Sequence, residues 1–221
     1  MRQYKQYCGV AKALDVVGER WTLLIVRDLL LGPRRYTDLR LALPGLTTNL
    51  LARRLRHLEE AGLIGRVALP PPASGEAYQL TQRGLELEPV VLALGRFGAR
   101  YLAHRDPTDR VDLRWGLVSL RRRYLGGLSG RLEIIAAGVP YTVDLYPDRL
   151  TSRDGSGGRA DVRIEGPTGP VMQVVLGGLS PVDLPVQVSG DATLLEALAV
   201  AIGARPEASA SPTAPGRGLG V

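Results

Sequence analysis

The chain has 221 residues, 45% of them hydrophobic, which allows two modest domains with their own cores and excludes disorder throughout. It has no run of about 18 apolar residues, no signal-like N-terminal segment and one cysteine, so we expect a cytoplasmic protein without membrane insertion. The net charge of +6 belongs to one half: residues 1–105 hold 16 Lys and Arg against 9 Asp and Glu, whereas the remainder holds 12 against 13. This asymmetry indicates a polyanion partner for the first half, although 26 Arg against 2 Lys is equally explained by genome base bias.

In the first half, turn residues separate short periodic segments. Apolar residues at helical spacing predict helices at Val10–Val17, Trp21–Leu31, Tyr36–Leu43 and Thr47–Ala61. Gly62 ends the fourth helix, and two strands, Leu63–Leu69 and Glu76–Leu80, flank a proline-rich loop. Thr81 is then expected to cap a long helix that runs to about His104. This order predicts a mostly helical winged helix-turn-helix over residues 1–105.

The second half mixes strand-like runs with apolar helices, and we expect an α+β domain over residues 111–204. Helices are predicted at Asp112–Tyr124, Thr168–Leu179 and Ala192–Ile202, the last with Asp191 as its N-cap. Strands are predicted at Arg131–Ala137, Pro140–Tyr146, Arg149–Arg153, Ala160–Glu165 and Val186–Ser189. Residues 205–221 are rich in Pro, Gly, Ser and Ala, cannot bury a core, and are expected to form a disordered tail.

The predicted helix Thr47–Ala61 has two faces when its residues are placed at intervals of about 100°. Its apolar side carries Leu51, Leu55 and Leu58, and its opposite side carries Thr48, Asn49, Ala52, Arg53 and Arg56. Arg can bind guanine through two hydrogen bonds, Asn can bind adenine in the same way, and a Thr methyl or Ala can contact the thymine methyl. The polar side, together with Thr47 at the helix start, therefore predicts a reader of the DNA major groove. Arg54 falls on the leucine side and is expected to form an internal ion pair.

Basic side chains also flank the preceding helix. Arg34, Arg35 and Arg40 are predicted to contact DNA phosphates, and Thr37 is a candidate cap for that helix, also placed at the DNA. The alternative is a solvated charged face, which is how most runs of charge behave. Their register with a turn and a predicted wing favours DNA binding.

A further signal comes from three segments: CGVAKALDVVGERWTLLIVRDLLLGPRRYTDL at residues 8–39, LARRLRHLEEAGL at 51–63 and EAYQLTQRG at 76–84. Together they closely resemble the HxlR-type family of MarR-like winged-helix regulators. The resemblance implies a homodimer formed largely through terminal helices, with the helix that starts at Thr47 as reader and the hairpin as wing. Family wings often carry a basic residue where Ala73 and Ser74 stand here, which leaves Arg66 as the remaining candidate for a wing contact.

Cys8 lies between Lys5 and Lys12, and nearby cations lower a thiol pKa and make it reactive. Some members of the family that the chain resembles use a cysteine here to sense oxidants or electrophiles, so Cys8 is a candidate redox sensor. The alternative is a small inert residue near the dimer interface. His57 and His104 are too few and too far apart in the sequence to suggest a metal site, and no metal or other cofactor is expected.

The second half carries another set of segments: ADVRIEG at residues 160–166, LGGLSP at 176–181 and VQVSGDATLLEAL at 186–198. These resemble a sterol-carrier-protein-type domain. The resemblance implies a sheet with helices over an apolar cavity that holds a lipophilic small molecule. The alternative is a filled core that serves only as a dimerisation or spacer module.

We therefore predict a DNA-binding transcriptional regulator of the HxlR type, a dimeric repressor on a double-stranded operator, with a hydrophobic-ligand-sensing C-terminal domain. The alternative is a lipid-binding carrier protein whose winged helix serves mainly as an interaction module. An enzyme is not expected, because the sequence shows no Ser/His/Asp set, phosphate-binding glycine loop or paired carboxylates.

Overall fold

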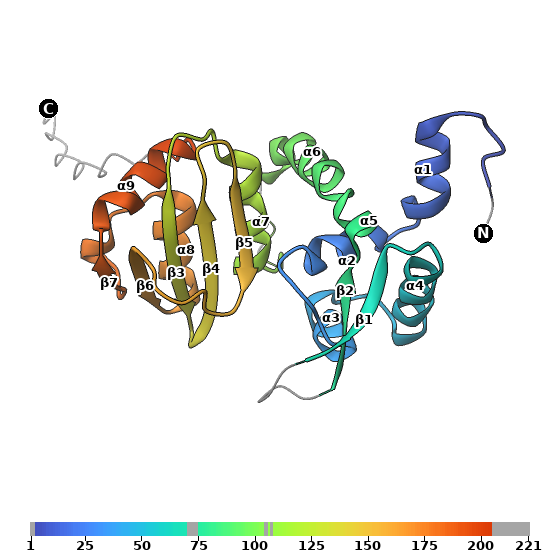
Figure 1. Ribbon diagram of the computed structural model, residues 1–221, viewed down its shortest axis with the longest axis horizontal. Coiled ribbons are helices and arrows are strands. Elements are labelled where there is room, and N and C mark those ends of the chain that lie inside the picture. The colour runs from blue at the N-terminus through green and yellow to red at the C-terminus, as the bar shows by residue number, and fades with distance from the viewer. Residues whose placement is uncertain (1–2, 70–74, 104–105, 107, 205–221) are drawn as a thin grey trace, which may run out of the picture.

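The computed structural model describes residues 3–69, 75–103, 106 and 108–204. Figure 1 shows two lobes, with α6 (Glu88–Gly98) and α7 (Leu113–Arg123) between them. The first lobe holds the described residues up to 103 and the second lobe those from 108 onward. The predictions made for Ala73, Ser74, His104 and the tail 205–221 concern residues outside the described ranges.

The first lobe has the predicted order of elements. Its helices are α1 (Gly9–Val17), α2 (Thr22–Leu29), α3 (Tyr36–Ala42) and α4 (Thr48–Glu60), each within two residues of the predicted bounds. Strands β1 (Ile64–Ala68) and β2 (Glu76–Leu80) pair antiparallel as the wing. Gly62 adopts the left-handed conformation just past α4, where a residue without Cβ is favoured. The prediction of a winged helix-turn-helix is confirmed.

The single long helix predicted from Thr81 to about His104 is wrong. The chain instead forms α5 (Gln82–Leu85), then α6, then a 3₁₀ turn, η1 (Ala99–Ala103). Thr81 does cap the first piece, because its hydroxyl accepts the backbone N–H of Gly84 at 3.0 Å. The break precedes Pro89, which lacks an N–H and disfavours helical geometry in the residue before it. Proline is tolerated in the first turn of a helix, so α6 starts at Glu88.

The second lobe is built on a mixed five-stranded sheet in the order β5-β4-β3-β6-β7. Its strands are β3 (Gly130–Ala136), β4 (Val139–Leu145), β5 (Leu150–Asp154), β6 (Val162–Gly166) and β7 (Gln187–Gly190). Strands β3 and β6 are parallel and the other neighbours are antiparallel. The remaining elements are α8 (Thr168–Gly177), the short η2 (Pro181–Asp183) and α9 (Ala192–Ala201). The expected α+β architecture is thus present, and Asp191 caps α9 as predicted by accepting the N–H of Thr193 at 3.1 Å.

Local geometry explains the β3–β4 hairpin. Ala136 pairs with Val139, which leaves a two-residue turn of Ala137 and Gly138, both at positive φ. Turns of this kind match the right-handed twist of the strands they join. Helices α8 and α9 contact each other and β6, and the interface holds Ile164, Val171 and Leu198 at 1% exposure or less. No helix in the described ranges is long and apolar enough to span a membrane.

The two lobes are joined by a buried polar junction centred on Asp28 of α2. One carboxylate oxygen of Asp28 accepts from Arg27 at 2.7 Å, and the other accepts from the indole N–H of Trp115 at 3.2 Å. The backbone carbonyl of Asp28 accepts from Arg114 at 2.8 Å, and Arg114 also pairs with Asp154 of β5. Because Asp28 and Arg114 are both buried, these bonds hold α2, α7 and β5 in one arrangement.

A second arginine of α7 extends this junction. Arg121 donates to the hydroxyl of Ser152 at 2.9 Å, to the carboxylate of Glu88 at 2.8 Å and to the carbonyl of Leu30 at 3.2 Å. One side chain thus contacts β5, α6 and the end of α2. The lobes meet through direct contacts as well as through the chain that links them.

Candidate nucleic-acid interface

The two faces of α4 lie as its sequence predicts. Leu51, Leu55 and Leu58 are buried at 1% exposure or less and form its inner face. The outer face of α4 consists of Thr48, Asn49, Arg53 and Arg56, which are exposed, with the partly buried Ala52 between them. Among the described residues, neither Arg53 nor Arg56 forms an ion pair, so both guanidinium groups are available to an external anion.

The start of α4 is held in place by two hydrogen bonds. Thr47 is the N-cap residue, and its hydroxyl accepts the backbone N–H of Leu50 at 3.4 Å. The Tyr36 hydroxyl of α3 donates to the carbonyl of Thr48 at 2.8 Å, which ties the two helices of the helix-turn-helix together. The partial positive charge of a helix N-terminus adds to that of Arg53 for a nearby phosphate.

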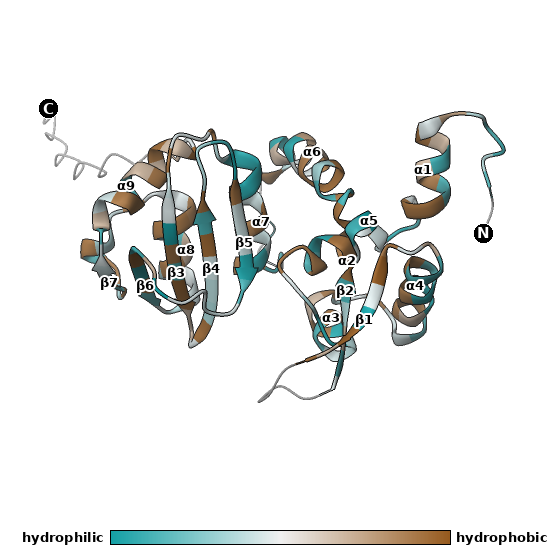
Figure 2. Cartoon of the chain, viewed as in Figure 1, coloured by the Kyte–Doolittle hydropathy of each residue, from teal (hydrophilic) through white to brown (hydrophobic). Residues whose placement is uncertain are grey.

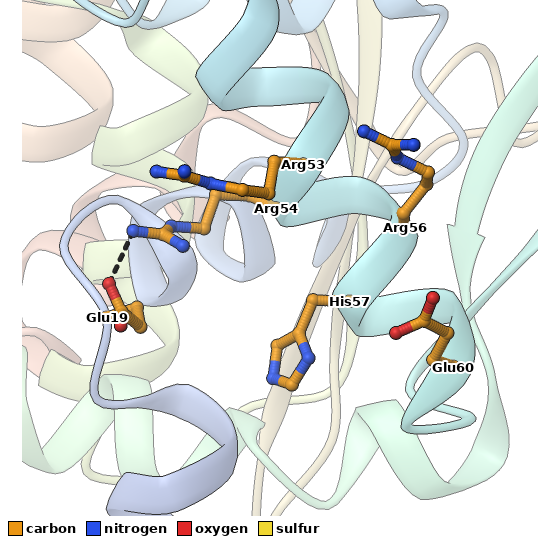
Figure 3. A pocket seen from close by; sticks show the side chains of 6 residues that line it. All are labelled: Glu19, Arg53, Arg54, Arg56, His57 and Glu60. Atoms are coloured by element: carbon orange, nitrogen blue, oxygen red, sulfur yellow. Dashed lines mark hydrogen bonds and ion pairs between the residues drawn. The ribbon is translucent and has the colours of Figure 1, made fainter. Parts of the chain in front are cut away.

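Arg54 forms the internal ion pair predicted for it. Its guanidinium lies 2.5 Å from a carboxylate oxygen of Glu19 and donates to the carbonyl of Arg20 at 3.1 Å (Figure 3). The neighbouring His57 has its Nε2 3.0 Å from the carbonyl oxygen of Val16. A hollow of about 540 Å³ lies beside these groups, lined by Glu19, Arg53, Arg54, Arg56, His57 and Glu60. Arg54 therefore joins α4 to the α1–α2 loop, whereas Arg53 and Arg56 have no dashed contact in Figure 3.

The N-cap of α3 differs from the prediction. Arg35 is the N-cap of α3, and the carboxylate of Asp38 accepts its backbone N–H at 3.2 Å. The expected cap role of Thr37 is wrong, because Thr37 lies inside the first helical turn, one position beyond the start of the helix. Arg34 exchanges backbone hydrogen bonds of 2.8 and 2.9 Å with Tyr78 of β2 and so extends the wing. Contacts of these residues with DNA stay predictions.

Arg66 of the wing is bound to two carboxylates of its own chain. It lies 2.9 Å from Glu59 at the end of α4 and 3.2 Å from Glu76 of β2, and its guanidinium stacks on the ring of Tyr78. The hydrogen bonds that Arg66 donates to Glu59 first and to Glu76 second raise the pKa of Arg66. A wing contact through Arg66 requires a phosphate to compete with both carboxylates.

Cys8 is exposed and occupies the N-cap position of α1. The backbone N–H groups of Ala11 and then Val10, at the start of α1, lower its thiol pKa. The helix N-terminus, rather than Lys12, is the cause: Lys12 lies 3.8 Å from Asp15. A lowered pKa raises the thiolate fraction at neutral pH.

The junction residues Asp28, Arg114, Trp115 and Arg121 were not predicted from the sequence. One signal was present, because Asp28 is a carboxylate inside an otherwise strongly apolar helix, where an unpaired charge is costly. Its partners on α7 lie more than 80 residues away in the sequence, so no local pattern identifies them.

Three relatives and a family model match the first lobe. A model described as HxlR-like helix-turn-helix matches residues 16–106 and ends before α7. The HTH-type transcriptional regulator sll1512 of Synechocystis sp. is 38% identical over 95 residues, which are 43% of this chain and 70% of that protein. YvaP of Bacillus subtilis is 33% identical over 102 residues, 46% of this chain and 94% of its own. Rv3095 of Mycobacterium tuberculosis is 41% identical over 94 residues, 42% of this chain and 59% of its own.

Solved structures are similar over the same part of the chain. The redox regulator HypR in its oxidized form is 31% identical in sequence, and the match covers 45% of this chain and 99% of the HypR chain, with a TM-score of 0.40. The reduced form of the transcriptional regulator YodB from B. subtilis is 27% identical in sequence. That match covers 46% of this chain and 100% of the YodB chain, with a TM-score of 0.38. The curated relatives are HTH-type transcription regulators and not enzymes, and they do not favour a lipid-carrier function.

Proposed function

The chain belongs to the HxlR-like helix-turn-helix family of transcriptional regulators, and from this premise we propose that it represses transcription by binding an operator as a homodimer. The outer face of α4 enters the major groove. Arg53 and Asn49 read base edges there, and Arg34, Arg35 and Thr37 lie nearer the phosphates. The wing, with Arg66, lies along the adjacent backbone.

One observation carries this proposal. The exposed side of α4 combines an amide, hydroxyls and two guanidinium groups that have no carboxylate partner in the described ranges, directly at the N-terminal half of the helix. A helix that merely presented a solvated charged face would be expected to pair many of its charges at i and i+4. Unpaired arginines beside an amide are suited to nucleic-acid edges.

The dimer is proposed to form through the terminal helices of the first lobe. Figure 1 shows α1 standing away from the rest of the lobe, and only Ala11 and Val17 of this helix are buried. Apolar residues nevertheless lie along it and along α6, as the brown segments of Figure 2 show. The exposed ones include Tyr7, Val10 and Leu14 near or in α1 and Val90, Leu94, Phe97, Tyr101 and Leu102 in α6 and η1. Burying these residues against a second copy would remove a large apolar surface from water.

The second lobe is proposed to act as an effector module of the sterol-carrier type that changes operator affinity. Its sheet, with α8 and α9 packed on it, is compatible with that type of domain. The buried junction of Asp28 with Arg114 and Trp115 supports coupling, because a movement of α7 must displace α2 in the first lobe. Cys8, with its lowered pKa, is proposed as a second, redox-dependent input.

A salt titration of binding to duplex DNA tests the central proposal. Contacts with 6–10 phosphates predict that affinity falls about 10³- to 10⁵-fold between roughly 50 and 200 mM salt. Affinity that does not change with salt would exclude this mode of binding.

Selection of bound sequences from a random duplex pool tests the dimer. A two-fold dimer should select an inverted repeat whose half-site centres lie about 34–36 Å apart on one face of the DNA. Tight binding of a monomer to one half-site would contradict the proposed assembly.

A further inference from the structure

A hollow of about 470 Å³ lies where the two lobes meet, outside the interface between sheet and helices of the second lobe. Three helices form its walls: α2 and α6 from the first lobe and α7 from the second. Most of its lining is apolar: Leu23, Leu24, Val91, Leu92, Leu94 and Val118, with Trp115 beside them. This volume lies within the range of about 300–1,000 Å³ that is typical of small-molecule sites.

The charged side chains that line this pocket, Arg27 and Arg122, are both positive. Arg122 lines it, and its only hydrogen bond within the described residues goes to the hydroxyl of Ser119 at 2.9 Å, a neutral acceptor. No ion pair of Arg122 exists within the described ranges, and burial first, then the charges of Arg123 and Arg96, lower its pKa. Arg27, the other cation of the lining, is already paired with Asp28. A partly buried guanidinium without a counter-ion is costly, so an anion beside Arg122 would stabilise this arrangement.

The pocket and the proposed dimer surface adjoin on α6 and share Leu94. Val90, Leu94 and Phe97 lie in one direction on the helix, whereas Val91 and Gly98 face the pocket, about 100° from Val90. A second copy of the chain on the outer face would therefore contact one rim of the pocket. The unpaired charge at its wall points to a small ligand rather than to an apolar protein surface.

We propose that the α2–α6–α7 pocket binds an organic anion with an apolar body, whose carboxylate or sulfonate group pairs with Arg122 while its body packs on Trp115 and the leucines. The role of this ligand as the effector rests on the proposed function. The binding of the ligand to the pocket is independent of that function. Because the ligand contacts α2, α6 and α7 together, it stabilises the arrangement of these helices that fits it best, and a preference for one arrangement is the condition for changing operator affinity.

The structure offers a matched pair of variants. Gly98 is the last residue of α6, and a Cβ added there meets nothing within 4 Å, so Gly98→Leu extends a side chain into the pocket without a clash at the backbone. Gly177 is the last residue of α8, has the same open surroundings and lies outside the lining, so Gly177→Leu is the control. Replacing glycine in a helix favours folding in both cases.

Binding to the full chain is measured by fluorescence with two probes: anilinonaphthalene sulfonate, which is anionic, and N-phenylnaphthylamine, which has a similar body without charge. Arg122→Met should weaken the anionic probe at least about 10-fold and the neutral probe less than about 2-fold. Gly98→Leu should weaken both probes, and Gly177→Leu neither. Equal effects of Arg122→Met on the two probes would overturn the anion assignment, and unchanged binding to Gly98→Leu would overturn the site.

The regulatory role of the pocket is tested by measuring affinity for the selected operator duplex with and without the anionic probe. Saturating anilinonaphthalene sulfonate should change the operator affinity of the wild-type chain about 5- to 150-fold and leave that of Arg122→Met unchanged. If the probe occupies the pocket and operator affinity stays the same, the effector role is wrong. If the chain binds no duplex at any salt concentration, the proposed function fails, and the fluorescence results still decide whether the site exists.

Discussion

Arginines on the sheet of the second lobe and arginines on the outer face of α4 differ in what lies beside them. On the sheet, Arg131 and Arg153 pair with Asp144, and Arg163 pairs with both Glu133 and Glu165. Arg53 and Arg56 have no such partner in the part of the chain that the structure describes. The count of arginines alone leaves genome base bias and polyanion binding equally good explanations. The free guanidinium groups of Arg53 and Arg56 favour polyanion binding by α4, because they are unpaired even with Glu60 four residues beyond Arg56.

The largest effect is expected at the lobe junction, where a buried arginine serves the fold. Arg114→Met removes the partner of Asp154 and leaves the carbonyl of Asp28 without its buried donor. We expect a loss of about 2–3 kcal/mol in the free energy of unfolding, less than for a fully buried pair because Asp154 is 34% exposed. Urea denaturation measures it. Arg163→Met is the control: Arg163 is 46% exposed, so its ion pair is screened by water and the loss should be much smaller. Equal losses for the two variants would contradict the contrast.

Next in size is the loss expected for a base contact. Arg53→Ala should weaken operator binding by about 1–3 kcal/mol and relax selectivity at particular base pairs, because a two-bond contact to a base edge is lost. Competition with operators substituted one base pair at a time measures both effects. Arg163→Ala should leave DNA binding unchanged. A loss for Arg53→Ala that is the same at every base pair would show that Arg53 does not read bases.

A smaller and uniform loss is expected for a phosphate contact. Arg34→Ala should weaken all duplexes alike and reduce the slope of log affinity against log salt by about 1, because one phosphate contact is removed. Salt titrations of the variant on operator and non-operator duplexes test this. A loss of affinity that is confined to the operator duplex would show that Arg34 contacts bases rather than phosphates.

The smallest change concerns Cys8, and it separates two explanations of its reactivity. The backbone N–H groups that lower its thiol pKa should shift the midpoint of alkylation by iodoacetamide below the value of about 8.5 for a free cysteine. The thiolate fraction at neutral pH is then larger than for a free cysteine and is lost as the pH falls through the lowered pKa. Lys5→Gln should leave the midpoint in place; a rise to the ordinary value would assign the shift to the lysine charge.

Features set by neighbours along the chain were predictable from the sequence. The two faces of α4 follow from the helical repeat, and Thr81 and Asp191 cap helices by contacts within three residues. The buried position of Arg54 also follows from the helical repeat. There are two exceptions. The break after α5 was missed because Pro89 was outweighed by an apolar pattern that continues through it, and the N-cap of α3 is Arg35 rather than Thr37.

Features that depend on distant segments were decided only by the tertiary structure. Periodicity predicts that Arg54 is paired, but not that Glu19 is its partner, nor that Arg66 is bound by Glu59 and Glu76. The junction at Asp28 and the pocket beside Arg122 bring together helices that lie up to about 90 residues apart in the sequence. A helix pattern states which side of each helix is apolar, whereas a pocket is the space that remains after those sides have packed, so it exists only once the packing is known.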